Sequence, residues 1–114
     1  MIVCFLSERG DEMDIKYKKN GSTLTVYIFG ELDEFSAHGA RELIDKLINN
    51  NLSVEKVVFE LSGLSFMDST GIGMLIGRYK KLKQFNIKSY IAGATIATEK
   101  VIELSGLYGI MPKY

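Results

Sequence analysis

Apolar and polar residues alternate along residues 13–30, on both sides of the dipeptide Asn20-Gly21. A period of two is typical of strands with one buried face, and Asn-Gly favours a tight hairpin because both residues accept positive φ. The pattern therefore predicts an antiparallel hairpin with strands near residues 14–18 and 24–29. We expect Gly30 to end the second strand, and the sequence ELDEFS that follows to form a loop.

The next segment, residues 36–51, has the apolar spacing of an amphipathic helix. Ser36 is placed to cap the amino end of this helix, and the run of asparagines at residues 49–51 ends it. The β-branched run VEKVVFELSGL, residues 54–64, then predicts one buried central strand. The apolar residues of the helix recur every three or four positions and form one stripe: Ala40, Leu43, Ile44, Leu47 and Ile48.

Two further helices alternate with one more strand in the second half of the chain. The segment IKSYIAG predicts a strand, and ATIATEKVIELSG predicts a helix that Gly106 ends in a left-handed conformation. Residues 107–114, which include Pro112, predict a short segment at a sheet edge. Before them, residues 70–85 return to a helical period through five apolar side chains: Ile72, Leu75, Ile76, Tyr79 and Leu82.

The resulting order of elements, β-β-α-β-α-β-α, predicts a single α/β domain. Strands separated by helices favour parallel pairs with right-handed crossovers, so we expect residues 13–114 to form a mixed, mostly parallel sheet with helices packed on it. Residues 1–12, MIVCFLSERGDE, show no clear period and are expected to be an N-terminal extension that is either disordered or not native. Met13 would then be the natural start, since ERGDE is compatible with a purine-rich ribosome-binding sequence before it.

The charge balance and the scarcity of ligand-type residues argue against several classes of protein. Lys plus Arg and Asp plus Glu each number 14, so the chain lacks the basic excess of nucleic-acid binders and membrane-surface proteins. A single cysteine, Cys4, and a single histidine, His38, form neither an internal disulfide nor a metal site. The run MIVCFL is too short to span a bilayer and lacks the features of a signal peptide. We expect a cytoplasmic protein that uses no cofactor.

The stretch SFMDSTGIG, residues 65–73, places a carboxylate, hydroxyls and glycines where a strand runs into a helix. Asp68, Ser69 or Thr70 could cap that helix, and the glycines would allow close packing against the sheet. The glycine spacing G-x-G-x-x-x-G departs from the dinucleotide fingerprint, so nucleotide binding is weakly supported. A nucleophilic Ser69 would lack both an adjacent base and the Gly-x-Ser-x-Gly turn. We therefore predict that the protein is not an enzyme and that His38 is a solvated first-turn residue.

A further interpretation makes Ser69 the substrate of a kinase. A phosphate adds about −1.5 to −2 charges and three acceptor oxygens, and the amino end of a helix favours negative charge. The domain would therefore stay folded after modification. Asp68 and Asp33 would be nearby like charges, and a partner docked over the helix would be displaced. Such a site would switch binding with little change of fold.

Three segments of the chain closely resemble a known family: GELDEFSA, LSFMDSTGIGMLIGRYKKLK and VIELSGLYGI, in this order and spacing. They are similar to the anti-sigma factor antagonists, small bacterial domains of the STAS class (sulfate transporter and anti-sigma antagonist). The similarity extends from about Met13 to Ile110. GRYK and LSGLYGI are more similar to the sporulation sigma-F branch than to the general stress-response branch.

The resemblance implies a partner-switching phosphoprotein that regulates transcription. In that family the unmodified antagonist binds an anti-sigma factor that is also a serine kinase, and so frees the sigma factor. Phosphorylation of the antagonist abolishes binding, and a PP2C-type phosphatase reverses it. By motif, the acceptor is Ser69 after Asp68, with Thr70 as the neighbouring hydroxyl and Asp33 as the acidic residue that supports the kinase reaction. The docking face would include part of the following helix: Gly71, Ile72, Arg78 and Tyr79.

Three alternatives stay open at this point. One is the same switch in the general stress-response pathway, and another is a nucleotide-binding STAS module that uses the glycines at positions 71, 73 and 77. The third is a purely structural scaffold, in which a charge at Ser69 would change no partner affinity. The basic run Arg78, Lys80, Lys81 and Lys83 is either a solvated helix face or a surface that meets acidic residues of the kinase.

Overall fold

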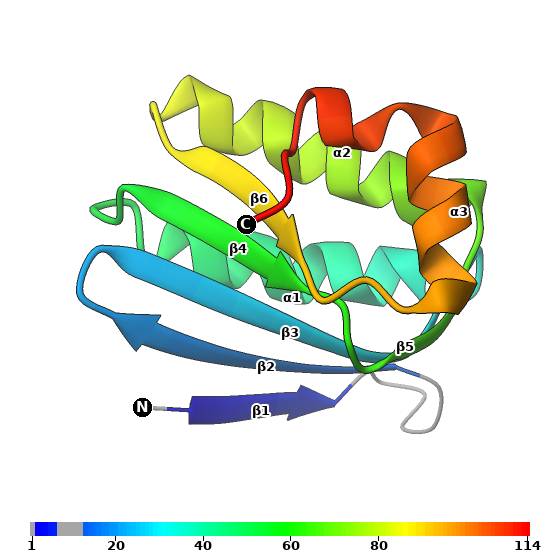
Figure 1. The fold of residues 1–114 in the computed structure, drawn as a ribbon. Coiled ribbons are helices and arrows are strands. Elements are labelled where there is room, and N and C mark those ends of the chain that lie inside the picture. The colour runs from blue at the N-terminus through cyan, green and yellow to red at the C-terminus, as the bar shows by residue number, and fades with distance from the viewer. Residues whose placement is uncertain (1, 7–12) are drawn as a thin grey trace.

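The computed structural model describes residues 2–6 and 13–114, and it shows one mixed sheet with helices packed against it (Figure 1). The predicted α/β class and single-domain fold are therefore confirmed. The strands are β1 (Ile2–Leu6), β2 (Met13–Asn20), β3 (Thr23–Leu32), β4 (Lys56–Glu60), β5 (Leu64–Met67) and β6 (Lys88–Ala92). The helices are α1 (Ala37–Asn49), α2 (Ser69–Gln84), α3 (Ile96–Ser105) and the short 3₁₀ helix η1 (Leu107–Gly109).

The sheet joins an antiparallel half to a parallel half. Its strand order is β1-β2-β3-β4-β6, with β5 beside β3. The pairs β1–β2 and β2–β3 are antiparallel, whereas β3 pairs in parallel with both β4 and β5, and β4 pairs in parallel with β6. Parallel strands end at one edge of a sheet, so the loops after β3, β5 and β6 gather at a common edge.

One hydrophobic core lies between this sheet and the pair α1–α2. Alternate side chains of β3, including Val26 and Ile28, are fully buried, as is Phe59 of β4. They belong to one core cluster with Ile44 of α1 and Leu75 of α2. The apolar stripes predicted from the helical period therefore face the sheet, and burying such side chains stabilises each helix by roughly 1.5–3 kcal/mol per large residue. None of the helices in residues 13–114 is long and apolar enough to cross a membrane.

The expected N-terminal extension, residues 1–12, lies partly outside the described residues. Within it, Ile2–Leu6 forms β1, which pairs with β2 in the register Ile2↔Lys18 to Leu6↔Asp14. The sequence analysis did not predict this strand, because the short apolar run has no alternation. That Met13 is the natural start stays a prediction.

The strand β3 is longer than predicted because it passes through a bulge at Gly30. Gly30 has φ of 93°, which glycine adopts readily, and the register with β5 shifts between Gly30 and Glu31. The strand then continues to Leu32, which pairs with Met67. The prediction that Gly30 ends the strand was wrong. The extra residues carry the chain to the edge where β5 also ends.

The run at residues 54–64, predicted as one central strand, contains β4 and the start of β5. After β4 the chain turns at residues 61–63, and β5 continues along the second half of β3. The Gly30 N–H donates to the Gly63 carbonyl (N···O 3.0 Å), and a Cβ atom on Gly63 would overlap the Phe29 ring. The step between the strands is not visible in the apolar pattern, because the buried residues of β4 are followed closely by Leu61 and Leu64, which are buried as well.

The C-terminal segment lies at the edge of the sheet, as the sequence predicted, and it is also held on α3. Gly106 ends α3 with φ of 76°, and Lys113 forms a parallel bridge to Ile91 of β6. The Tyr108 hydroxyl donates to Glu99 Oε2 (2.8 Å), while Lys113 Nζ lies 3.0 Å from Glu99 Oε1. One carboxylate thus binds both η1 and the last residues of the chain.

The hydrogen bond between Tyr108 and Glu99 predicts a tyrosine that ionises at a higher pH than the others. Burial, and then the hydrogen bond to Glu99, raise the pKa of Tyr108 to about 12. Because the pKa is raised on folding, the corresponding stability is present below the ordinary value of 10.0 and is lost as pH rises through about 12. We expect absorbance titration to show one of the six tyrosines ionising last, and Tyr108→Phe to remove that component. Tyr114→Phe, at a more exposed ring, is the control; a late component that survives Tyr108→Phe would contradict the assignment.

Candidate functional site

Asp33 and the segment Asp68–Thr70 meet where β3 and β5 end side by side. Leu32 and Met67 are partners in the last register position of the two parallel strands. One residue further on, the Asp68 N–H donates to the Leu32 carbonyl (3.3 Å). The sheet therefore brings together the two acidic positions that the sequence singled out separately. Their adjacency depends on the continuation of β3 beyond Gly30.

Asp68 is the residue that caps α2. Its backbone is extended (φ −110°, ψ −172°), and its Oδ1 accepts hydrogen bonds from the N–H groups of Thr70 (2.9 Å) and Gly71 (3.2 Å). These are two of the amides that a helix start leaves without a partner in the helix. The sequence left the cap open between Asp68, Ser69 and Thr70, and the structure decides it for Asp68.

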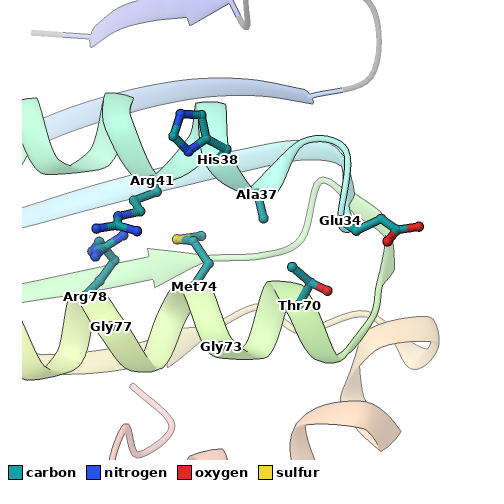
Figure 2. A pocket seen from close by; sticks show the side chains of 9 residues that line it. All are labelled: Glu34, Ala37, His38, Arg41, Thr70, Gly73, Met74, Gly77 and Arg78. Carbon is teal, nitrogen blue, oxygen red and sulfur yellow. The ribbon is translucent and has the colours of Figure 1, made fainter.

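Ser69 and Thr70 are therefore not needed as caps. Both are exposed on the first turn of α2. Among the described residues, the Ser69 hydroxyl has no hydrogen-bond partner. Thr70 lies on the side of α2 that faces α1, as Figure 2 shows. Ser69 thus offers a hydroxyl that solvent or another protein can reach and that the fold does not use.

Asp33 organises the loop between β3 and α1. Its Oδ1 accepts from the N–H groups of Phe35 (2.9 Å) and Ser36 (3.1 Å), and its carbonyl accepts from the Ala37 N–H (2.9 Å). Ser36 occupies the N-cap position, as predicted, but its side chain caps no helix amide. Its hydroxyl donates instead to the Glu31 carbonyl (2.7 Å). No side chain caps α1: the Asp33 carboxylate accepts the amides of the loop before the helix, and the first helix amide, that of Ala37, donates to the Asp33 backbone carbonyl.

Gly71 and Ile72, expected on the docking face, are buried beneath it. A Cβ atom on Gly71 would lie 2.7 Å from both the Leu32 carbonyl oxygen and Met67 Cγ. Ile72 is 5% exposed and belongs to the core. Both residues hold the start of α2 against the ends of β3 and β5 and so offer little surface, and their part in partner binding stays a prediction. Tyr79 is half-buried, with Lys83 Nζ 5.8 Å from its ring centre.

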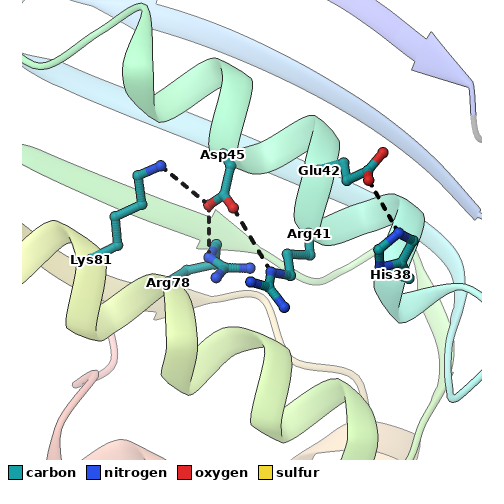
Figure 3. A network of polar contacts seen from close by, with 6 residues as sticks. All are labelled: His38, Arg41, Glu42, Asp45, Arg78 and Lys81. Atoms are coloured by element: carbon teal, nitrogen blue, oxygen red, sulfur yellow. Dashed lines mark ion pairs between the residues drawn. The ribbon is translucent and has the colours of Figure 1, made fainter.

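Arg78 is also buried, although the sequence favoured a solvated helix face for the basic run. It is 6% exposed, and its Nε lies 3.0 Å from Asp45 Oδ1 on α1. Figure 3 shows that Lys81 and Arg41 approach the same carboxylate, with Lys81 Nζ 3.6 Å from Oδ1 and Arg41 Nε 4.0 Å from Oδ2. Burial lowers the pKa of Arg78, Asp45 opposes this effect, and Arg41 adds to it. The sequence analysis missed Asp45, since an acidic residue beside a helix stripe is ordinarily solvated.

An open groove of about 570 Å³ runs between α1 and α2 (Figure 2). It begins near Thr70 and reaches the charged residues around Arg78. The sequence analysis did not predict it, because it depends on how two helices pack. Its lining residues are Glu34, Ala37, His38, Arg41, Thr70, Gly73, Met74, Gly77 and Arg78.

The geometry weakens the catalytic and nucleotide-binding alternatives. The glycines at 71, 73 and 77 all lie inside α2, where the Gly71 N–H donates to Asp68 Oδ1 and the other two lie within helical turns, so they form no loop that could cradle a phosphate. His38 is a solvated first-turn residue, as predicted, and its Nε2 lies 3.1 Å from Glu42 Oε1. In the described part of the chain, no three His, Cys, Asp or Glu residues are grouped to hold a metal ion.

Comparison with known proteins identifies the family. The sequence pattern described as the STAS domain matches residues 14–114. The chain belongs to the STAS domain family. The segment Asp68–Thr70 and the groove are thus features of a STAS domain.

Two relatives of this STAS domain are both named as antagonists of anti-sigma factors. The anti-sigma F factor antagonist of Paenibacillus polymyxa is 31% identical over 102 residues, covering 90% of this chain and 86% of the relative. The anti-sigma-B factor antagonist of Staphylococcus aureus is 29% identical over 86 residues, covering 75% of this chain and 78% of the relative.

A solved relative shares the fold as well as the sequence pattern. The anti-sigma factor antagonist SpoIIAA in its unphosphorylated form superposes with a TM-score of 0.73 at 27% identity, covering 88% of this chain and 87% of that chain. The Bacillus protein SpoIIAA in its phosphorylated form superposes with a TM-score of 0.65, covering 88% and 90%. These similarities confirm the predicted resemblance to anti-sigma factor antagonists of the STAS class.

The packing at the start of α2 in this STAS domain gives a matched pair of glycine substitutions. We expect Gly71→Ala to lower the free energy of unfolding by about 1–3 kcal/mol, because the methyl group overlaps Leu32 and Met67. Gly73→Ala should raise it by about 0.5–1 kcal/mol, since a Cβ there meets nothing within 4 Å and alanine favours the helix. Urea denaturation of both variants measures the difference. Equal stabilities would contradict the close contact at Gly71.

Proposed function

We propose that this STAS domain is an anti-sigma factor antagonist whose binding is switched by phosphorylation of Ser69. The unphosphorylated form binds an anti-sigma factor that is also a serine kinase, and a sigma factor is thereby released. Phosphorylation by that kinase ends the binding, and a PP2C-type phosphatase restores it. The protein acts in the cytoplasm as a regulator of transcription, with no enzymatic activity of its own.

The observation that carries the proposal is the exposed Ser69 hydroxyl beside a cap that another residue supplies. Asp68 satisfies the amides of Thr70 and Gly71, so a phosphate on Ser69 replaces no hydrogen bond of the fold. The amino end of α2 carries partial positive charge that favours an anion. Modification of Ser69 is thus compatible with the folded domain. The resemblance to SpoIIAA, which has been solved in unphosphorylated and phosphorylated forms, supports this assignment.

Electrostatics explains how the phosphate would end binding. It adds about −1.5 to −2 charges next to the carboxylates of Asp68 and Asp33, at a point that a docked kinase must cover. Enclosing such a charge in an interface without a matching cation costs several kcal/mol, and about 1.4 kcal/mol is a tenfold change in affinity. The switch therefore works on the partner's affinity and leaves the fold of the antagonist in place.

Exposed apolar side chains at the same edge of the sheet support a protein partner. Phe35, in the loop after β3, is 59% exposed, and Ile96, at the start of α3 after β6, is 97% exposed. Both lie at the edge where the parallel strands end, which is also the position of Ser69. Aromatic and large aliphatic residues at an exposed edge are typical of contact surfaces. We propose that they form part of the docking face.

The pathway is proposed from similarity alone. The matched relatives include antagonists of both sigma-F and sigma-B regulators, at 31% and 29% identity. We propose the sporulation sigma-F pathway because the segments GRYK and LSGLYGI resemble that branch. The second candidate is the same switch in the general stress-response pathway, favoured by the relative from Staphylococcus aureus.

The acceptor is tested by measuring intact mass after incubation with the cognate anti-sigma kinase and ATP. We expect the wild type and Thr70→Ala to gain one phosphate and Ser69→Ala to gain none. Thr70→Ala is the matched control, because Thr70 is the adjacent exposed hydroxyl on the same turn. The phosphorylated protein should bind the kinase at least roughly tenfold more weakly than the unmodified protein. A phosphate on Ser69→Ala, or equal binding by both forms, would overturn the proposal.

Asp33 gives a second test, because its loop-holding role and its charge can be separated. Asp33→Asn keeps an oxygen that can accept from the Phe35 and Ser36 amides but removes the negative charge. We expect it to change the free energy of unfolding by less than about 1 kcal/mol and to slow phosphorylation of Ser69 roughly tenfold. Asp33→Ala should lose both stability and phosphorylation rate. If Asp33→Asn is phosphorylated as fast as the wild type, the charge of Asp33 has no part in the reaction.

A further inference from the structure

Two glycines of α2 have no structural reason to be glycine. Gly73 and Gly77 lie four residues apart inside the helix and line the groove between α1 and α2 (Figure 2). A Cβ atom on either would meet nothing within 4 Å, in contrast to Gly71, where it would overlap the end of β3. Glycine inside a helix is destabilising relative to alanine. A group from outside the chain that approaches α2 closely would explain why the surface is bare there.

The far end of the same groove carries excess positive charge. Arg41, Arg78 and Lys81 surround one carboxylate, Asp45, so this cluster has two more positive than negative charges (Figure 3). The Arg78 side chain is 8% exposed, and its Nη1 atom is buried without a hydrogen-bond partner. Buried donors of this kind are costly when unpaired. Figure 2 shows the guanidinium groups of Arg78 and Arg41 next to each other at the groove's end.

The groove begins beside the acceptor serine. Thr70, which follows Ser69, is one of the lining residues. A protein that covers Ser69 is therefore placed to reach over Gly73 and Gly77 towards the arginines. A free polyanion such as a nucleotide fits less well, because Glu34 lines the groove and Asp33 and Asp68 lie close to its start.

We propose that the anti-sigma factor inserts one carboxylate side chain, from an aspartate or a glutamate, into this groove. The side chain passes over Gly73 and Gly77 and pairs with the exposed guanidinium of Arg41, next to Arg78, which also lines the groove. The inference rests on the proposed function and adds to it a second point of attachment, away from Ser69. Phosphorylation at Ser69 and pairing at the arginines then act on the same partner from opposite ends of the groove.

The test measures the dissociation constant between the chain and its anti-sigma factor for the wild type and three variants. Arg41→Glu reverses the accessible charge, and Gly77→Leu fills the groove; neither changes Ser69 or its neighbours. Lys80→Glu makes the same charge reversal at an exposed residue of α2 and serves as the control. We expect Arg41→Glu and Gly77→Leu to weaken binding at least roughly tenfold, and Lys80→Glu to change it less than about threefold. Thermal unfolding of each variant checks that the fold is kept.

The possible outcomes separate this inference from the proposed function. If the wild type does not bind the anti-sigma factor, the proposed function fails and the inference fails with it. If the wild type binds and the folded Arg41→Glu and Gly77→Leu variants bind equally well, the inference alone is overturned. If inorganic phosphate or ATP binds the wild type in the absence of a partner, and this binding is lost in Gly77→Leu, the groove binds a small anion and the inference is overturned. Recovery of Arg41→Glu binding by an acidic-to-lysine change in the partner would identify the inserted side chain.

Discussion

The close contact between the first turn of α2 and the end of β3 is the constraint on which the site depends. Gly71 leaves no room for a side chain between α2 and Leu32, and the Leu32 carbonyl accepts from the Asp68 amide in the same place. Because this contact fixes where α2 begins, it also fixes Asp68 as the cap and turns Ser69 to solvent. A looser junction would let the helix start earlier or later, and the position of Ser69 would not be defined by the fold.

Polar contacts connect α1 and α2 at Asp45. Arg78 lies between the helices and is paired with Asp45, and Lys81 and Arg41 approach the same carboxylate. A buried ion pair contributes little net stability, since desolvating both charges offsets their attraction, but breaking it by removing one partner is costly. The cluster therefore sets the relative position of the two helices more than it strengthens the fold. The width of the groove follows from that position.

The sequence predicted those elements whose periodicity was undisturbed and missed features that depend on contacts between distant residues. The hairpin at Asn20-Gly21, the three helices and the left-handed end at Gly106 follow from local patterns, and the structure confirms them. The step between β4 and β5 could not be predicted, because Gly63 is required by the ring of Phe29 on another strand.

The sequence could predict which residues make up the candidate site, but it could not predict which of them are exposed and which are buried. Asp33 and Asp68–Thr70 could be singled out by type and motif, and strand geometry explains why they meet. The burial of Gly71 and Arg78 could not be predicted in the same way. Helical spacing defines which residues share a side of α2, but the sheet and Asp45 on α1 determine which side is covered.

Asp68 caps α2 and Ser69 does not, and this difference has a kinetic consequence. Asp68 completes the hydrogen bonding of the helix start, while the neighbouring hydroxyl takes no part in it. A group that the fold does not use can be modified and restored through many cycles without any step of unfolding or rearrangement. Under the proposed function, the response time is then set by the turnover of the enzymes that modify and restore Ser69 and by the dissociation of the partner. The antagonist itself adds no delay.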